Sequence, residues 1–434
     1  MKIVRIGKTF LLVLLFLFFT SITVSATSPS DLTDTLADIF EGLIDENEGL
    51  TSFRSLYIPS GGKSEAMGSS FTALANDIGF FEYNPAASCQ LEETELAVFH
   101  NSWISDSALE TIAYTQRIGN LGYGASLRCF YVPFTEYNIF GDRVSNGYYS
   151  ETVGTLNVSY NFLAGYVFKG ICVGANVKTG YRSVPDYSDD DTDEVITDSG
   201  STQSALAFMG DTGILLRFNV LKFYSARDPN FKFGLTVHNL GVIFTNFTEE
   251  IDTSESLPSY ISTGISYSFI RPVTITFEFQ QPFNISDLSS SESWSAGTGT
   301  SVVITPFFSM LGGFQLRGGS PRFTMGAELS VSEIIFNINY TLDMTTSTTP
   351  INRISVTAKM ELGDGGRYDL QTKIDNLYST GLHLYADGKL EEAIDVWSQI
   401  LDYSPHYDPA IAGIESARAS IELEERIKEI QQLD

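Results

Sequence analysis

Residue types that perform chemistry are few in this sequence, and their spacing gives them little chance to cooperate. The four histidines, His100, His238, His383 and His406, are not spaced as metal ligands. Neither a Gly-x-Ser-x-Gly elbow nor a Gly-Lys-Ser/Thr phosphate loop occurs. His100 or His238 could act as the base of a Ser–His hydrolase, although strand histidines more often pack or face water. We therefore predict no catalytic residue, no metal and no cofactor, and keep a hydrolase as a second alternative.

The acidic run over residues 189–194 is the other candidate for chemistry. Hard cations such as Ca²⁺ are bound by several carboxylates, but this run has no recognisable ligand spacing. Runs of like charge are usually solvated, so a solvent-exposed loop is the better interpretation.

The three cysteines, Cys89, Cys129 and Cys172, are an odd number for a disulfide framework. Strand alternation puts Cys129 and Cys172 on opposite faces. We predict that the cysteines fill space and form no disulfide framework.

The composition excludes some classes of partner. Of the 434 residues, 18% are charged and 13% are aromatic, and the formal net charge is −27. Soluble domains usually carry about 25% charged residues. A low charge content with many aromatics suits a protein whose outer face meets lipid. The acidic balance argues against nucleic acid and against docking on an anionic membrane surface.

The N-terminus has the form of a secretory signal. Three basic residues precede an apolar run over residues 10–24, and small residues follow as far as Ala26. We predict a signal peptide at residues 1–26, with a retained membrane anchor as the alternative. Residues 27–57 are predicted to form a periplasmic acidic amphipathic helix and a linker.

Residues 95–362 alternate apolar and polar side chains with a period of two, as half-buried strands do. Along 155–162, for example, leucine, valine, tyrosine and phenylalanine alternate with threonine, asparagine and serine. Fourteen such segments can be placed, at 95–104, 107–118, 120–133, 151–163, 170–183, 203–220, 229–244, 257–270, 271–283, 293–305, 309–318, 321–332, 333–342 and 351–362. An even number fits a single-chain outer-membrane barrel. A soluble β-sandwich or jelly roll is the alternative fold, but its solvent-exposed face would carry more Lys and Glu than the polar faces of these segments do. We predict an all-β transmembrane barrel of about 14 antiparallel strands.

The polar face of these segments carries most of the basic residues of the barrel. If the apolar faces meet lipid, the inward charges are Arg117, Arg128, Lys178, Arg182, Arg217, Lys232, Arg317, Arg353 and Lys359, against Asp211, Glu278, Glu328 and Glu361. A basic lumen would suit a ligand with a carboxylate head and an apolar tail. We expect Arg128, Lys178, Arg182, Arg217, Lys232 and Arg317 to be ligand-binding candidates. The alternative is that lipid forces any charge inward, whatever the function.

Residues 64–87 precede the strands and carry a recognisable pattern. Met67-Gly68 is followed by Thr72-Ala-Leu-Ala75 and, further on, by Asn84-Pro85-Ala86. This pattern resembles the N-terminal signature of the FadL-like outer-membrane transporters of hydrophobic compounds. The segments 174–178, 257–269 and 314–319 are similar to strand signatures of the same superfamily, most of all to an uncharacterised branch of FadL-like paralogues in spirochaetes.

The resemblance implies that residues 58–94 form a plug or hatch inside the barrel, with Asn84, Pro85 and Ala86 as its hatch motif. It also implies uptake of long-chain fatty acids or similar hydrophobic molecules across the outer membrane by passive diffusion, past the plug and out through a gap in the wall. Gly122, Gly124 and Pro133 are candidates for the kink that makes this gap. The alternative is an ordinary short helix before an all-β domain.

After residue 366 the rhythm becomes helical, and one segment resembles a tetratricopeptide repeat. The positions that carry the resemblance are Gly381, Gly388, Ala393, Trp397 and Pro405. Residues 367–434 are therefore predicted to form a small all-α periplasmic domain that could bind a protein or peptide, with a plain helical hairpin as the alternative. A barrel that only anchors such a domain for assembly or secretion is the alternative function. An even strand count predicts that both chain termini lie in the periplasm, so that the plug enters the barrel from the end that bears the helical domain.

Overall fold

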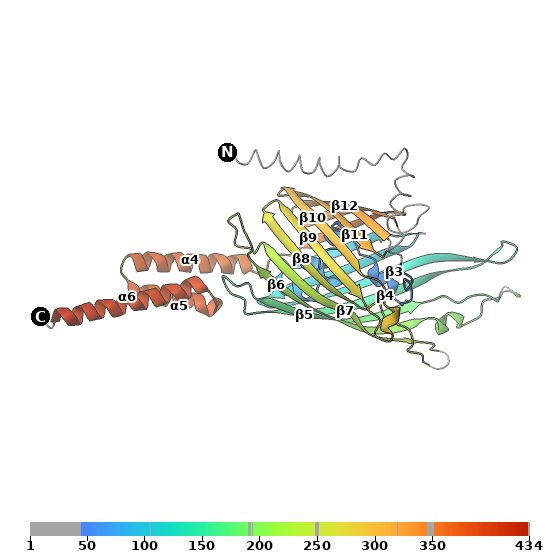
Figure 1. The fold of residues 1–434 in the computed structure, drawn as a ribbon, viewed down its shortest axis with the longest axis horizontal. Coiled ribbons are helices and arrows are strands. Elements are labelled where there is room, and N and C mark those ends of the chain that lie inside the picture. Colours follow the sequence, from blue (N-terminus) through green and yellow to red (C-terminus); the bar gives the residue numbers. More distant parts are fainter. Residues whose placement is uncertain are drawn as a thin grey trace.

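The computed structural model describes residues 45–432, apart from residues 105, 190–191, 193, 248–250, 319 and 345–350. It shows a closed antiparallel barrel of fourteen strands with a segment inside it and three helices beyond one end (Figure 1). The strands are β1 (Glu95–Ser102), β2 (Ala108–Ile118), β3 (Leu121–Tyr137), β4 (Arg143–Phe162), β5 (Ile171–Ser183), β6 (Ala205–Phe218), β7 (Phe231–Thr245), β8 (Tyr260–Ile270), β9 (Val273–Pro282), β10 (Ser295–Thr305), β11 (Phe308–Arg317), β12 (Ser320–Val331), β13 (Ile334–Asp343) and β14 (Ile351–Glu361). The predicted barrel and its strand number are confirmed.

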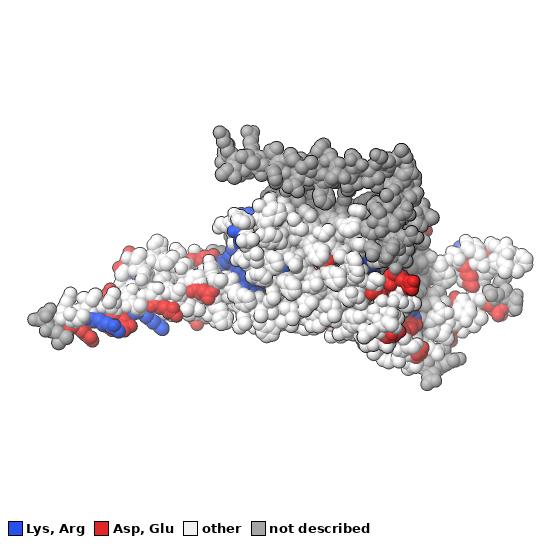
Figure 2. Space-filling view, in the orientation of Figure 1, with Lys and Arg blue, Asp and Glu red and all other residues white. Residues whose placement is uncertain are grey.

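The barrel closes because β1 pairs with β14, from Glu95 opposite Glu361 to Asn101 opposite Ser355. Along each strand, apolar side chains point outward and polar side chains point inward, as Leu156, half exposed or more, and the buried Asn157 illustrate. Figure 2 shows the middle of the barrel wall on this face as largely free of charge. A closed ring with an apolar outer face is not a two-sheet sandwich, so that alternative is wrong. Among the described residues, no helix is long and apolar enough to cross a membrane.

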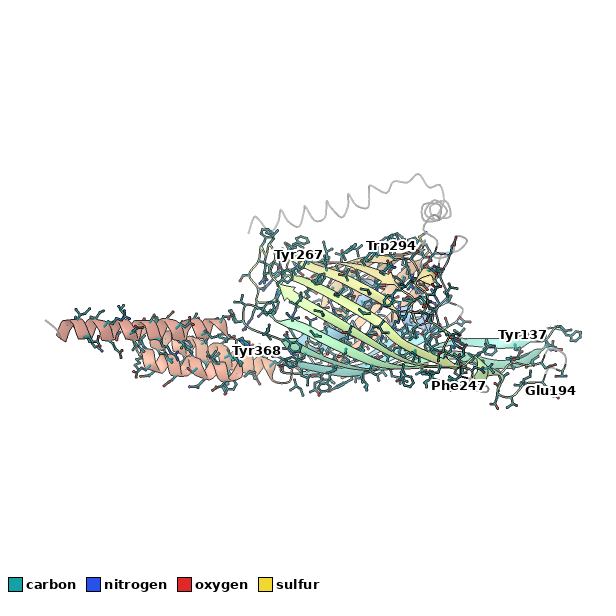
Figure 3. All side chains as sticks on the ribbon, turned by 60° about the horizontal axis from the view of Figure 1, so that its bottom comes forward. Tyr137, Glu194, Phe247, Tyr267, Trp294 and Tyr368 are labelled. Carbon is teal, nitrogen blue, oxygen red and sulfur yellow. The ribbon has the colours of Figure 1, made fainter. Side chains whose placement is uncertain are left out.

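The two ends of the barrel differ. At one end lie the short turns between β2 and β3, β8 and β9, β10 and β11, and β12 and β13, together with the helices; we call it the helical end. The other, the loop end, carries the longer segments 184–204, 246–259 and 283–294. Tyr137 lies at the tip of the β3–β4 ribbon, which projects far past the loop end (Figure 3). β4 therefore begins at Arg143, before the predicted 151, because a ribbon in water needs no apolar face.

The segment before β1 crosses the lumen. It consists of η2 (Arg54–Tyr57), α3 (Gly62–Ala66), η3 (Ile78–Glu82) and η4 (Pro85–Gln90), joined by turns, and we call residues 54–91 the plug. Its core is a cluster of fully buried side chains that includes Met67, Phe71 and Phe80. The plug therefore fills the lumen.

The plug begins at the loop end. The Asn47 side chain donates to the Ser289 and Ser291 carbonyl oxygens at 3.3 and 3.0 Å, whereas Thr94 donates its N–H to Gly363 at the helical end, at 2.9 Å. The expectation that the plug would enter from the end bearing the helical domain is therefore wrong. An even strand count fixes only where the wall begins and ends, and says nothing about the segment before it.

Some predictions lie outside the described residues. These are the signal peptide at 1–26, most of the acidic helix and linker at 27–57, and half of the acidic run at 189–194. The position of the N-terminus itself stays a prediction. All three cysteines are free thiols, Cys89 and Cys172 being buried inside the barrel.

The C-terminal helices are α4 (Arg367–Ala386), α5 (Leu390–Tyr403) and α6 (Asp408–Gln432). Trp397 is buried where α4 and α5 cross, and a Cβ atom at Gly381 would stand 2.3 Å from its Nε1 atom. Ala393 is fully buried, Gly388 turns the chain at φ 78°, and Pro405 follows α5. The five positions singled out from the sequence thus sit at the helix contact, the turn or the end of α5.

Candidate functional site

Inward-facing glycines let the plug backbone lie directly against the barrel wall. The wall glycines and the plug residues that they meet are Gly122 with Ser88, Gly174 with Pro85, Gly213 with Asn84, Gly234 with Thr72, and Gly313 with Gly68. At Gly174, a Cβ atom would stand 2.2 Å from the Pro85 carbonyl oxygen, a distance that real Cβ atoms essentially never show. A side chain at these positions would therefore push the plug away from the wall.

Polar wall side chains satisfy the buried plug backbone. Four asparagine side chains donate to plug carbonyl oxygens: Asn101 to Pro59 (2.7 Å), Asn157 to Pro85 (2.9 Å), Asn176 to Phe81 (3.2 Å) and Asn339 to Gly62 (2.7 Å). On β9, the Glu278 carboxylate accepts the N–H groups of Phe71 and Thr72, each at 2.8 Å. An irregular segment can be buried only if such partners replace water, so the wall is built around this plug.

The predicted hatch motif lies at the centre of this contact. The Asn84 side chain accepts the Ala86 N–H at 3.0 Å and donates to the Thr72 carbonyl at 2.8 Å, so it caps η4 and ties it to an earlier turn. Pro85 follows at the first position of η4, where its missing N–H costs nothing. Asn84 also donates to the Ile214 carbonyl of β6 at 3.3 Å. The motif therefore holds the plug both to itself and to the wall.

A buried polar network joins the wall to the residue before this motif. On β6, Asp211 accepts from Lys178 at 2.7 Å and from the Asn239 N–H at 2.8 Å, and His238 lies 3.6 Å away. The His238 Nε2 atom is 3.1 Å from the Tyr83 carbonyl oxygen. This is the nitrogen that would activate a serine, so the geometry of His238 gives no support to a hydrolase at this position.

The wall is irregular at this network and regular where the sequence suggested a kink. The β6–β7 register shifts between Gly210 and Thr212, in the middle of both strands. β3, in contrast, pairs without a break through Gly122, Gly124 and Pro133. The kink expected in β3 is therefore absent from these positions, and the irregularity lies at the β-bulge of β7 instead.

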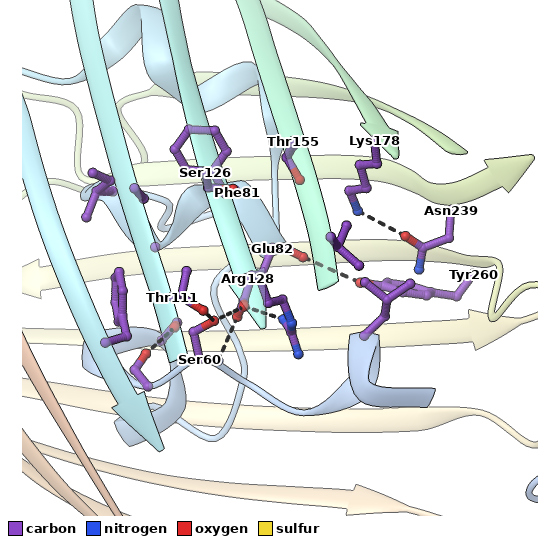
Figure 4. A pocket seen from close by; sticks show the side chains of 18 residues that line it. Ser60, Phe81, Glu82, Thr111, Ser126, Arg128, Thr155, Lys178, Asn239 and Tyr260 are labelled. Carbon is purple, nitrogen blue, oxygen red and sulfur yellow. Dashed lines mark hydrogen bonds and ion pairs between the residues drawn. The ribbon is translucent and has the colours of Figure 1, made fainter. Parts of the chain in front are cut away.

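One ion pair separates two cavities of very different size. Arg128 pairs with Glu82 of η3 (Figure 4). It also donates to the Ser55 and Ile58 carbonyl oxygens. Below this pair, towards the helical end, the lumen retains a cavity of about 40 Å³, lined by residues such as Thr155. That is room for little more than one water molecule. The lumen is thus closed at the plug.

Above the pair, an outer pocket of about 450 Å³ opens at the loop end. Its lining combines arginines with aromatic rings: Arg54, Arg317, Arg322, Arg353, Tyr57, Trp103, Phe130 and Tyr149, with Glu48, Ser55, Ile58, Ile104, Glu151 and Asp343. Cavities of this size, mostly apolar with a few charged groups, are typical of sites for small ligands.

Arg353 differs from the other arginines of the pocket in having buried donors without a partner among the described residues. Its guanidinium carbon lies 3.6 Å above the Trp103 ring, and one of its nitrogens is 3.3 Å from Asp343. Its Nε and Nη1 atoms are buried and have no hydrogen-bond partner in the described part of the chain. A buried guanidinium with two unused donors can bind a carboxylate with little further desolvation.

The chain has relatives among known proteins. The sequence matches the uncharacterised protein family UPF0164 over residues 30–365. The chain belongs to this family. A UPF0164 protein of Treponema pallidum (strain Nichols) is 31% identical over 391 residues, which cover 88% of this chain and 86% of the relative. A second one from the same organism is 25% identical over 395 residues, covering 86% and 77%. The UPF0164 match takes in the plug and all fourteen strands, and it stops before α4.

The solved structures that are similar to part of this chain include a transporter and a porin. The P. putida toluene transporter TodX has a TM-score of 0.46 at 10% identity, over 70% of this chain and 98% of TodX. The KdgM porin has a TM-score of 0.30 at 9% identity, over 62% of this chain and 99% of the porin.

The six basic candidates all lie inside the UPF0164 barrel or at its mouth, but they are distributed over its length and most already have partners. Arg128 pairs with Glu82, Lys178 with Asp211, Arg182 with Glu255 and Arg317 with Glu292. Arg217 and Lys232 lie towards the helical end and donate to the Lys169 and Leu74 carbonyl oxygens, at 3.0 and 3.1 Å. The single basic lumen expected from the sequence is therefore divided, and only Arg317 lines the outer pocket.

Sequence reasoning missed several residues of the site. Arg322 lines the outer pocket. It could have been predicted to point inward, because it alternates along β12 with the outward Phe323 and Met325. The wall glycines could have been found in the same way, since Gly174 interrupts a polar face. Arg54 and Tyr57 carry no such signal, because the plug has no regular period.

Proposed function

We propose that this UPF0164 protein is an outer-membrane channel that admits small hydrophobic molecules with an anionic head, such as long-chain fatty acids, by passive diffusion. The observation that carries the proposal is the outer pocket, whose lining brings Arg353, with two donors that have no partner among the described residues, together with apolar and aromatic side chains. A carboxylate would bind Arg353 while its chain packs on rings such as Trp103 and Phe130. The plug and its Asn84-Pro85-Ala86 motif support membership of the FadL-like superfamily.

The orientation follows from the lengths of the connections. Single-chain outer-membrane barrels keep short turns in the periplasm and longer loops outside. The loop end and its pocket would then face the exterior, and the helices would hang in the periplasm. A ligand would travel from the outer pocket, past Arg128 and Glu82, to the helical end.

A second cavity supports this route. A chamber of about 480 Å³ lies between the helical end of the barrel and α4, and five of its lining residues are basic: Arg117, Lys169, Arg217, Arg227 and Arg367. Figure 2 shows Lys and Arg side chains at this end of the barrel. Arg117, Arg217 and Arg367 donate to backbone carbonyls, so their charge remains available to an anion leaving the lumen.

Uptake of labelled oleate into proteoliposomes tests the proposal. Arg353→Gln keeps the pocket's shape and removes its charge, so half-saturation should rise about tenfold for oleate, the loss expected for one charge-assisted contact of about 1.4 kcal/mol. Uptake of oleyl alcohol, which has no carboxylate, should change little. An equal effect on both probes would contradict the role given to the guanidinium.

A partner-binding function for α4–α6 has one observation in its favour. Leu423, Ile427 and Ile430 recur at helical spacing on α6 and are about half exposed or more. An exposed apolar stripe of this kind suits a protein partner, and the tetratricopeptide-like positions in α4 and α5 agree with it. If so, Leu423→Ser with Ile427→Ser should release proteins recovered with the full-length chain, without changing oleate uptake. Recovery that is unaffected would count against this role.

A further inference from the structure

We infer that this chain carries a lipid-facing esterase site on its outer wall, in which Ser102 is the nucleophile, His100 the base and Glu110 the residue that positions it. His100 and Ser102 lie two residues apart on β1, so both point outward, and Glu110 stands directly opposite His100 on β2. The His100 Nδ1 atom is 2.7 Å from a Glu110 carboxylate oxygen, and its Nε2 atom is 3.2 Å from the Ser102 hydroxyl oxygen.

The strand register fixes this arrangement. Residues opposite each other on antiparallel strands have Cβ atoms about 5 Å apart, within reach of a Glu–His hydrogen bond. A carboxylate at Nδ1 favours the tautomer that leaves Nε2 free to accept the serine proton. The three residues therefore occupy the roles of nucleophile, base and orienting acid without any movement of the backbone.

The surroundings of the site indicate its substrate. The outward neighbours on β1, β2 and β14 are apolar and exposed: Val98, Ile112, Ile354 and Val356. A carboxylate on the lipid-facing side of a barrel is costly except near the headgroup level. The site lies near the loop end, so it would meet the ester bonds of lipids in the outer leaflet. The substrate class is accordingly an acyl ester of a membrane lipid, and the co-reactant is water.

The reaction has two balanced steps. Ser102 Oγ bonds to the ester carbonyl carbon as its proton passes to His100 Nε2, and the alcohol leaves with that proton. Water, deprotonated by His100, then attacks the acyl-serine, releases the carboxylic acid and restores the serine. Trp103 and Ser107 donate their N–H groups to carbonyl oxygens of their own loop, at 2.8 and 3.0 Å, so these N–H groups do not form an oxyanion hole. Because one oxyanion donor contributes about 10²–10³-fold to kcat, we expect the enzyme to be slow.

The site adjoins the outer pocket. Ser102 faces lipid, whereas Trp103, the next residue, lines the pocket beneath Arg353. A fatty acid released at Ser102 would therefore lie beside the guanidinium proposed to bind it. This link to uptake and the position of the site at the outer leaflet rest on the proposed function, but the hydrolysis itself does not.

The test uses the full-length protein in detergent micelles and in phosphatidylcholine vesicles. A fluorophosphonate probe should label Ser102, as read by peptide mass spectrometry, and the protein should release fatty acid from a fluorogenic phosphatidylcholine. Ser102→Ala should abolish labelling and lower hydrolysis at least about 100-fold, and Glu110→Gln should lower it about tenfold. Thr152→Ala, which removes an outward hydroxyl on β4, should change neither.

Two results would overturn the site: a wild-type protein that is neither labelled nor active, or hydrolysis that survives Ser102→Ala. Oleate uptake measured on the same preparations separates the proposals. Uptake without hydrolysis removes the esterase and leaves the channel, whereas hydrolysis without uptake removes the channel and leaves the esterase.

Discussion

The plug meets the barrel wall in two different ways. Near the loop end, side chains make the contact: Arg54 and Tyr57 face Glu292 and Arg317, and about 450 Å³ remains open. From Ala66 to Gln90 the plug backbone lies against wall glycines, and the cavity beside Ser64 and Glu82 has only about 40 Å³. Flexible side chains can rearrange around a ligand, whereas a plug backbone packed directly against wall glycines cannot shift without losing that packing. A ligand can therefore bind in the outer pocket with the plug in place, but it can cross the barrel only if the plug moves.

The largest effect should come from filling a glycine contact. Gly174→Val would place side-chain atoms where the Pro85 carbonyl lies, so we expect a loss of about 3 kcal/mol in plug seating, at the upper end for overpacking. Proteoliposomes should then leak a small hydrophilic dye. Gly154→Val is the matched control, because a Cβ atom at Gly154 meets nothing within 4 Å. Equal leakage from both variants would contradict the seating argument.

A smaller effect is expected from the ion pair between the two regions. Among the described residues, Arg128→Gln leaves the Glu82 carboxylate with the Ser60 N–H and hydroxyl as partners. Breaking a buried ion pair typically costs about 3 kcal/mol, and the cost is smaller where one partner stays partly solvated. The melting temperature should fall. Combining Glu82→Gln with it should restore part of the loss, because no unpaired charge remains. A double variant less stable than Arg128→Gln alone would show that the pair does not act as a unit.

A cap on the plug should matter less again. Asn84→Ala removes the cap of η4 and the bond to Thr72, a loss of about 1 kcal/mol, and it should raise the rate of oleate uptake while the barrel stays folded. Pro85→Ala should act in the same direction more weakly, since its backbone conformation can be kept. Unchanged uptake in both variants would remove the motif from the gate.

The smallest effect should lie outside the lumen. Backbone N–H groups of Tyr368 and Gly366 bind Asp364 and hold its pKa below the usual 3.8. Because the folded pKa is the lower one, the stabilisation is present above about pH 4 and is lost as the pH falls through the folded value. Asp364→Asn should therefore lower helical-domain stability slightly at pH 7, and its difference from wild type should shrink as the pH falls through the folded pKa of Asp364. A change in oleate uptake at pH 7 would contradict the separation of the helices from the plug.

The wall could be predicted from the sequence, and the plug's contacts could not. Each of the fourteen strands overlaps the segment in which the period-two alternation places it, because lipid and lumen impose opposite side-chain preferences on successive residues. The alternation also put Arg128 and Lys178 inward. It could not show that Glu82 neutralises Arg128, since an ion pair between plug and wall depends on the path of an irregular segment. It also could not show that Asp211 neutralises Lys178, since that pair depends on the register between β5 and β6. The Ser102–His100–Glu110 arrangement escaped for a similar reason, because its third member is fixed only by the β1–β2 register.

The uptake of labelled oleate into proteoliposomes tests the central claim most directly. Vesicles containing the wild-type protein should take up oleate faster than protein-free vesicles, with a saturable rate whose half-saturation rises about tenfold in Arg353→Gln. Wild-type vesicles that fill no faster than empty ones, with the barrel shown to be folded, would contradict it.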